Sequence, residues 1–253
     1  VLKRPYAADH SMDNGKEQVM VANVDYVFIV SSLNDNYNFN RIARYVSMTL
    51  QGNAIPVVIL TKADLCSNPG RYASEIERLS EKVKVHCVSA LYGIGMDELN
   101  KYVQPGKTIA ILGSSGVEKS TLVNALVQED VMKTSEIRES DSKGRHTTTH
   151  RQMIVLLNGA RIIDTPGMRE LGMCDTDQGI ADTFSDIAEL ESCCKFSNCR
   201  HETEPGCAIR AAIADGTLSR DRYELYRSLH EESRHAAKMR DISKWRKQLK
   251  KRR

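Results

Sequence analysis

The chain has 253 residues, of which 41% are hydrophobic and 27% charged, a composition that excludes disordered, collagen-like and coiled-coil proteins. No segment approaches the 18 uncharged apolar residues of a membrane helix, and the first residues lack the apolar core of a secretory signal, so we expect a soluble, cytoplasmic protein. Residues 234–253 carry ten Lys or Arg and one acid, a net charge of +9, whereas residues 1–233 carry a net charge of −6. This basic end favours a polyanionic partner such as RNA, although a solvated helix end would look the same.

The first 20 residues are polar and indicate a linker, trimmed at its start because no initiator Met is present. Buried apolar runs then alternate with amphipathic helical patterns. Strands are predicted over residues 25–32, 55–60, 83–90 and 107–113, and helices over residues 39–50, 71–80, 96–103 and about 119–127. Because each strand is followed by a helix, this pattern predicts an α/β fold, a mostly parallel sheet with helices on both faces.

The pattern changes after the fourth helix. A polar, Thr-rich stretch predicts a loop, followed by two strands that a tight Asn158-Gly159 turn connects, and then by helices that a cluster of Cys and His interrupts. The expected loop covers residues 132–150, the strands 153–157 and 161–164, and the helices 208–214, 220–229 and 235–249. We therefore predict a linker over residues 1–20, a nucleotide-binding domain over 21–175 and a helical domain over 176–253.

A glycine-rich segment, GSSGVEKST, lies between the fourth predicted strand and its helix. It matches three of the four fixed positions of the phosphate-binding pattern G-x-x-x-x-G-K-[ST], in which backbone N–H groups and the helix N-terminus hold the β-phosphate. Lys119 would neutralise β- and γ-oxygens, and the Ser120 hydroxyl would ligate Mg²⁺. The candidate nucleotide-binding residues of this segment are Gly113, Ser114, Ser115, Gly116, Val117, Glu118, Lys119, Ser120 and Thr121.

Glu118 stands where the pattern has its second glycine. Its Cβ crowds backbone that must wrap around phosphate, and its charge repels the nucleotide. At about 5 Å and an effective dielectric constant near 20, this repulsion is roughly 3 kcal/mol, more than a hundredfold in affinity. An acid at an empty helix N-terminus is, by contrast, stabilising by about 0.5 kcal/mol. Glu118 therefore favours the empty loop.

Two segments at the carboxyl ends of other predicted strands have the character of a guanine reader, TKAD and VSA. The Asp64 carboxylate can accept two hydrogen bonds from the N1–H and N2–H₂ edge of guanine, a donor pair that adenine lacks. The stem of Lys62 would cover the base, and the Ser89-Ala90 backbone would meet its O6 oxygen. The candidate base-binding residues are Thr61, Lys62, Ala63, Asp64, Ser89 and Ala90. Alone, TKAD would be a structural turn; its place on the same sheet edge favours base recognition.

The segment DTPG closes the last predicted strand. Asp164 is placed to reach Mg²⁺ through water, and the Gly167 N–H to touch a γ-phosphate. Standing alone, the segment would be read as a Pro-Gly turn. The preceding loop contains GRHTTTHR, in which Thr148 or a neighbour would complete the Mg²⁺ shell.

Three cysteines and one histidine form a cluster with the spacing Cys194-x4-Cys199-x-His201-x5-Cys207. In a chain without a secretory signal, such a cluster indicates metal ligation before disulfides. Three thiolates and one imidazole make a closed tetrahedral set, which suits a structural Zn²⁺ and leaves no position for an activated water. The alternative is a group of buried, metal-free thiols.

These motifs occur in an unusual order, with TKAD and VSA before the phosphate loop and DTPG last. With GRHTTT and CKFSNCRHETEPGC, the chain resembles the RsgA (YjeQ) family of circularly permuted GTPases that associate with the small ribosomal subunit, from about Val21 to the C-terminus. The resemblance implies a P-loop GTPase fold and hydrolysis of GTP to GDP with Mg²⁺ during late maturation of that subunit and its rRNA. The family also carries an N-terminal OB-fold, of which at most the trailing linker is present.

The resemblance also bears on single residues. Met168 follows DTPG, where ordinary switch GTPases place a Gln that orients water, and the family is similar in having an apolar residue there. His146 is then the candidate to orient the attacking water, with Lys119 and Thr148 completing the catalytic set. Cys193 falls outside the family spacing of the metal ligands.

We expect a monomer whose metal domain is repositioned when GTP and Mg²⁺ order the switch loops. Two alternatives compete with the GTPase. One is a nucleotide-poor rRNA-binding assembly module that retains only the fold, which Glu118 favours. The other is a generic P-loop ATPase, in which TKAD would have no purpose.

Overall fold

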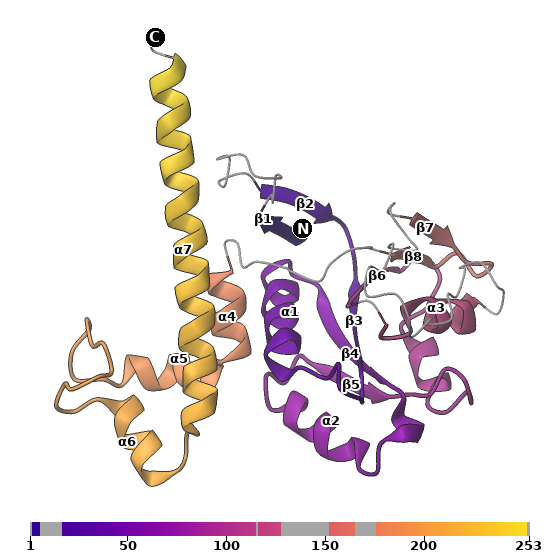
Figure 1. Ribbon diagram of the computed structural model, residues 1–253, viewed down its shortest axis with the longest axis horizontal. Coiled ribbons are helices and arrows are strands. Elements are labelled where there is room, and N and C mark those ends of the chain that lie inside the picture. Colours follow the sequence, from indigo (N-terminus) through magenta and orange to yellow (C-terminus); the bar gives the residue numbers. More distant parts are fainter. Residues whose placement is uncertain (1, 6–16, 115, 128–151, 165–175, 252–253) are drawn as a thin grey trace.

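The computed structural model describes residues 2–5, 17–114, 116–127, 152–164 and 176–251. A sheet with helices on both faces is joined to a helical region that ends in one long helix (Figure 1). The strands of the sheet are β3 (Tyr26–Ser32), β4 (Ile55–Thr61), β5 (Lys84–Cys87), β6 (Thr108–Gly113), β7 (Gln152–Val155) and β8 (Arg161–Asp164). Their order is β5-β4-β3-β6-β8-β7, and all neighbours are parallel except β7 and β8. The predicted α/β fold is confirmed.

Continuous apolar runs form the central strands because both faces of the sheet are covered. In β3, Val27 and Ile29 face one hydrophobic core, whereas Phe28 and Val30 face the other. The first core includes α1 (Phe39–Gln51) and residues at the end of α2 (Pro69–Glu77). The second includes α3 (Lys119–Val127) and the 3-10 helix η2 (Asp97–Lys101), the short helix predicted over residues 96–103.

The N-terminal segment differs from the predicted linker. β1 (Leu2–Pro5) and β2 (Glu17–Val21) pair as an antiparallel two-stranded sheet. Leu2, Met20 and Val21 are buried in the core that includes α1. These residues are buried by contacts with distant parts of the chain, and no apolar run in this polar segment predicts that burial.

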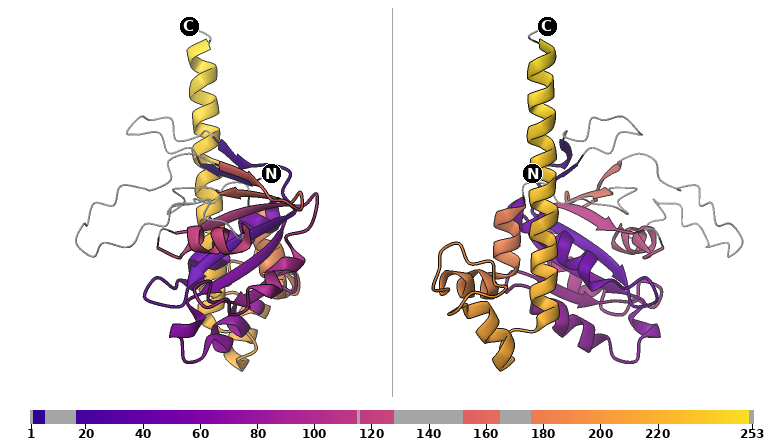
Figure 2. Two further views of the ribbon diagram at one scale, coloured as in Figure 1. Left: turned by 90° about the vertical axis from the view of Figure 1, so that its right-hand side faces the viewer. Right: turned by 60° about the vertical axis from the view of Figure 1, so that its left-hand side comes forward.

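The helical region consists of α4 (Asp177–Thr183), α5 (Ser185–Ser192), α6 (Ala208–Asp215) and α7 (Arg220–Lys251). The prediction of two helices over residues 220–229 and 235–249 is wrong, because α7 runs through both without a break. The intervening sequence, HEESR, contains neither Gly nor Pro to end a helix. At 1.5 Å per residue α7 is about 48 Å long, and its C-terminal part extends beyond the other elements in all three views (Figure 1 and Figure 2).

Helix α4 crosses α1 at very short range. A Cβ on Gly179 would lie 2.0 Å from the Ser47 carbonyl oxygen, so only glycine fits at this crossing. The Ser47 and Thr183 hydroxyls hydrogen-bond at 2.9 Å, and the Gly179 N–H donates to Gln51 Oε1 at 2.9 Å. The helical region is thereby packed directly on the layer that covers the sheet. None of the described helices is long and apolar enough to cross a membrane.

Candidate functional site

The predicted nucleotide-binding segments meet at the carboxyl edge of the sheet. Thr61 closes β4 opposite Ser32 of β3, and Gly113 closes β6 opposite Val30. Asp164 closes β8 and pairs with Ile111 of β6. In open α/β sheets, this edge is where ligands bind, at the point where connections leave the central strands in opposite directions. The structure therefore brings together TKAD, the phosphate loop and the start of DTPG.

At Gly113, where the phosphate loop leaves β6, the backbone lies so close to β3 that a side chain would not fit. A Cβ at this position would lie 2.6 Å from the Val30 carbonyl oxygen. The Lys119 ammonium turns back over the loop and donates to the carbonyls of Gly113 at 2.8 Å and Ser114 at 2.6 Å. The Ser114 hydroxyl accepts from the Arg41 guanidinium at 3.1 Å. Positive charge is thus concentrated at the loop, as phosphate binding requires.

Thr61 and the phosphate loop are joined by a buried hydrogen bond. The Thr61 hydroxyl donates to the Val117 carbonyl at 3.1 Å, and its residue is fully buried. Its side chain is thereby occupied in positioning the loop and does not point to solvent. Thr61 therefore contributes to the site by fixing the distance between its base-reading and phosphate-binding parts.

Glu118 contacts the base-reading segment. It adopts φ +64°, in the left-handed region that the glycine of the pattern would enter without strain. Its carboxylate lies 3.6 Å from Lys62 Nζ, and the two side chains are 34% and 17% exposed. The Glu118 carboxylate of the phosphate loop therefore forms an ion pair with Lys62, the residue predicted to cover the base.

The two base-reading segments are held together by their backbones. The Ala63 N–H donates to the Val88 carbonyl at 3.1 Å, and the Ser89 N–H to the Ile94 carbonyl at 2.9 Å. These two N–H groups thus donate hydrogen bonds within the protein. Of the Ser89-Ala90 backbone that was predicted to meet the guanine O6 oxygen, the Ala90 N–H is then the predicted donor. Asp64 lies in the 3-10 helix η1 (Ala63–Leu65), and its residue is exposed.

The residues predicted to bind Mg²⁺ are described in part. Asp164 is 3% exposed at the end of β8, and Ser120 and Thr121 are half-buried in the first turn of α3. A buried carboxylate and a hydroxyl at one sheet edge are oxygen ligands of the kind that Mg²⁺ prefers. Four other predicted site residues lie outside the described part of the chain: Ser115, His146, Thr148 and Gly167.

The predicted metal ligands lie together in the helical region. One ligand atom from each of Cys194, Cys199, His201 and Cys207 falls within 4.8 Å of the others. The His201 Nδ1 atom is 3.6 Å from the Cys194 sulfur and 3.4 Å from the Cys207 sulfur. A tetrahedral Zn²⁺ with bonds of about 2.0 and 2.3 Å separates a nitrogen and a sulfur ligand by about 3.5 Å. The donor set and its spacing are compatible with zinc, and Cys193 is exposed outside the cluster.

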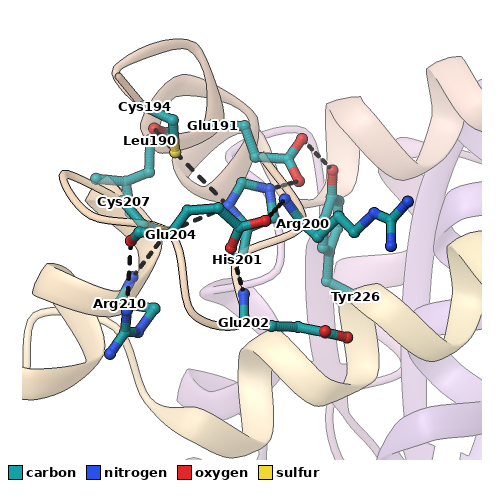
Figure 3. A network of polar contacts seen from close by, with 10 residues as sticks. All are labelled: Leu190, Glu191, Cys194, Arg200, His201, Glu202, Glu204, Cys207, Arg210 and Tyr226. Carbon is teal, nitrogen blue, oxygen red and sulfur yellow. Dashed lines mark hydrogen bonds and ion pairs between the residues drawn. The ribbon is translucent and has the colours of Figure 1, made fainter. Parts of the chain in front are cut away.

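The connecting loop of the cluster is held by one carboxylate. Glu204 accepts hydrogen bonds from the backbone N–H groups of Arg200, Glu202 and Thr203 at 2.9–3.0 Å. Figure 3 shows Glu204 with Arg200 and Glu202. These bonds lower the pKa of Glu204 to about 2. Burial raises the pKa of the Cys199 thiol to about 11, a shift that a bound cation would reverse.

Sequence reasoning missed two residues of these sites, Arg41 and Glu191, and one contact between predicted residues, the Lys62–Glu118 ion pair. Arg41 and the Lys62–Glu118 pair join segments whose contact depends on strand order, and no spacing signals them. Glu191 contacts the His201 ring, with Oε1 3.3 Å from Nε2. Its position three residues before Cys194, about one helical turn, was a usable signal.

The chain was compared with known sequences. A sequence model of the RsgA GTPase family matches residues 2–174. The small ribosomal subunit biogenesis GTPase RsgA 1 of Listeria innocua is 45% identical over 238 residues, which cover 94% of this chain and 69% of that protein. The RsgA of Methanosarcina acetivorans is 44% identical over 230 residues, covering 91% of this chain and 62% of that protein.

Solved structures are similar in fold. YjeQ from Thermotoga maritima matches with a TM-score of 0.61 at 28% identity, covering 83% of this chain and 72% of that chain. YloQ, described as a circularly permuted GTPase, matches with a TM-score of 0.57 at 24% identity, covering 87% and 69%, and shows the fold alone. These matches agree with the permuted motif order, with the fold and with the prediction of a GTPase. The chain therefore belongs to the RsgA GTPase family, as its motifs indicate.

Proposed function

We propose that the chain binds and hydrolyses GTP and acts in late maturation of the small ribosomal subunit, with nucleotide binding weakened by Glu118. The observation that carries this proposal is the meeting of TKAD, the phosphate loop and Asp164 at one sheet edge. Curated relatives more than 40% identical are named small ribosomal subunit biogenesis GTPases, which supports the same role here.

In this proposal, Asp64 selects guanine and Lys119 neutralises the β- and γ-phosphates. Mg²⁺, held by Ser120 and Asp164 with Thr148, supplies charge stabilisation at the transferring phosphoryl group. His146 orients the attacking water.

The helical region serves the ribosomal partner. The Cys₃His cluster holds one structural Zn²⁺ and so folds a polar loop that lacks a core of its own. The basic segment over residues 234–253 binds rRNA phosphates, and its affinity falls with salt. We propose that the protein works as a cytoplasmic monomer, with residues 21–175 as the nucleotide domain and 176–253 as the metal domain.

A second candidate is an rRNA-binding assembly module that rarely holds nucleotide. The Lys62–Glu118 ion pair favours it, because the pair engages the residue that would cover the base and places a carboxylate in the phosphate loop. In this role, the fold would present the metal domain to RNA, and the phosphate loop would be structural.

Titration with fluorescent GDP and ADP analogues tests the proposal. The full chain should bind GDP and not ADP. Asp64→Asn replaces one acceptor by a donor, so it should lose about 100-fold in GDP affinity and favour xanthosine diphosphate, whose C2 oxygen accepts. GTP hydrolysis should rise when small ribosomal subunits are added. Subunit binding without any measurable nucleotide affinity would instead support the assembly module.

A further inference from the structure

A carboxylate of α5 lies between the metal cluster and the long helix. Glu191 Oε1 is 3.3 Å from Nε2 of His201, and Glu191 Oε2 accepts a hydrogen bond from the Tyr226 hydroxyl at 2.8 Å. Figure 3 shows this side chain between the ring of His201 and α7. One carboxyl group thus contacts a metal ligand and a different helix at the same time.

The surroundings of the two ring nitrogens assign the tautomer of His201. Nδ1 faces the sulfurs of Cys194 and Cys207, so Nδ1 is the ligand atom, and Nε2, 3.3 Å from Glu191 Oε1, carries the ring proton. A carboxylate on the free N–H of a metal-binding imidazole fixes the ring and raises its basicity, which strengthens metal binding. Burial and the Glu191 hydrogen bond raise the pKa of Tyr226, so its hydroxyl remains a donor.

Tyr226 belongs to the face by which α7 is attached to the protein. One turn earlier, Arg222 binds both carboxylate oxygens of Asp186 at 2.7 and 2.9 Å. The Tyr226 ring packs edge-on against Phe184, with centroids 5.6 Å apart. Two turns later, the Ser233 hydroxyl donates to Asp177 of α4 at 2.8 Å. The first turns of α7 are thus held by a line of contacts that includes Tyr226, whose partner Glu191 lies beside the metal ligand His201.

We propose that Glu191 is the outer-shell carboxylate of the metal site and that, through Tyr226, metal binding and the docking of α7 stabilise each other. This inference rests on the proposed zinc site. Coupling is reciprocal, so any factor by which metal stabilises the docked helix is the factor by which docking strengthens metal binding. The basic segment of α7 is therefore oriented by the metal some turns away.

Zinc affinity of the full chain, measured by competition with a chromophoric chelator, tests the first step. Glu191→Gln should bind zinc 10- to 100-fold more weakly, the usual effect of losing an outer-shell carboxylate. Glu189→Gln is the matched control, because it removes the same charge from an exposed position of α5 and should change the affinity less than about twofold. The visible spectrum of the Co²⁺-substituted protein reports separately whether three sulfurs and one nitrogen still bind. Equal affinities of the two variants would overturn the inference.

Hydrogen exchange tests the second step. In the unaltered chain, zinc should slow the exchange of α7 amides over residues 222–233. Tyr226→Phe keeps the ring and removes the hydroxyl, so this protection by zinc should fall about fivefold or more while Co²⁺ coordination is retained. If zinc protected the α7 amides of Tyr226→Phe as well as those of the unaltered chain, the coupling to α7 would be refuted, and the role of Glu191 at the metal site would be unaffected. Failure of the unaltered chain to bind Zn²⁺ or Co²⁺ would remove the metal site itself, and with it the inference.

Discussion

Two substitutions at Glu118 separate the effect of its charge from that of its side-chain volume. Glu118→Gln removes the charge and keeps the Cβ. Repulsion of a phosphate at about 5 Å is roughly 3 kcal/mol, and the Lys62 cation is present in both proteins, so its attraction for phosphate does not enter the difference. This repulsion predicts that Glu118→Gln binds GDP more than about 100-fold more tightly than the unaltered chain.

Glu118→Gly removes the Cβ as well. Backbone strain at φ +64° is present with and without nucleotide, so its relief changes stability more than affinity. Crowding of the phosphate by the Cβ acts only in the complex. Overpacking of about 1.4 kcal/mol predicts a further tenfold gain for Glu118→Gly over Glu118→Gln.

Fluorescent GDP titration of all three proteins at one salt concentration measures both steps. Glu81→Gln is the control for charge removal, because Glu81 is exposed just before β5, at the amino end of the sheet strands. A GDP affinity of Glu118→Gln within threefold of the unaltered chain would refute the electrostatic argument. A gain that appears only in Glu118→Gly would assign the whole effect to the Cβ.

Two further predictions concern stability. Gly179→Ala should destabilise the protein by about 3 kcal/mol in urea unfolding, because its Cβ would lie 2.0 Å from the Ser47 carbonyl oxygen. The control Gly70→Ala, whose Cβ would have no neighbour closer than 3.8 Å, should stabilise the protein by about 0.5–1 kcal/mol. Equal effects of the two substitutions would contradict the close helix crossing. Hydrogen bonds from Lys107 and the backbone lower the pKa of Asp25, so its contribution to stability is present above pH 4 and lost as the pH falls through the lowered pKa. Asp25→Asn should thus cost about 1 kcal/mol at pH 7, with a difference from the unaltered chain that shrinks below pH 4 in unfolding titrations.

The central sheet was predictable because its signals are local. Strands β3, β4 and β6 are apolar runs long enough to be covered on both faces, and their observed ends lie within one residue of the predicted ones. By contrast, β1 and β2 depend on burial of Leu2 and Met20 against α1, which no local pattern encodes. The unbroken course of α7 was missed, although no residue between positions 229 and 235 breaks a helix.

The site was predictable where one motif carries the chemistry and not where two motifs meet. The spacing of the cysteine cluster gave all four members of the group within 4.8 Å. The contact of Glu118 with Lys62 joins residues 56 positions apart, and its existence follows from β4 and β6 flanking β3. The sequence analysis of Glu118 therefore described its repulsion of phosphate and omitted its ion pair with Lys62.

The packing of α1 bears on how nucleotide binding and the metal region are connected. Arg41, in the first turn of α1, contacts Ser114 of the phosphate loop, and Arg44, one turn on, binds Glu232 of α7 at 2.7 Å. Farther along the helix, Ser47 holds α4 through a buried hydrogen bond. Because close-packed helices shift as units and do not deform continuously, we expect a change at the phosphate loop that moves α1 to move α4 and α7 as well. A packed route between the two sites therefore runs along α1, in addition to the covalent path from β8 to α4.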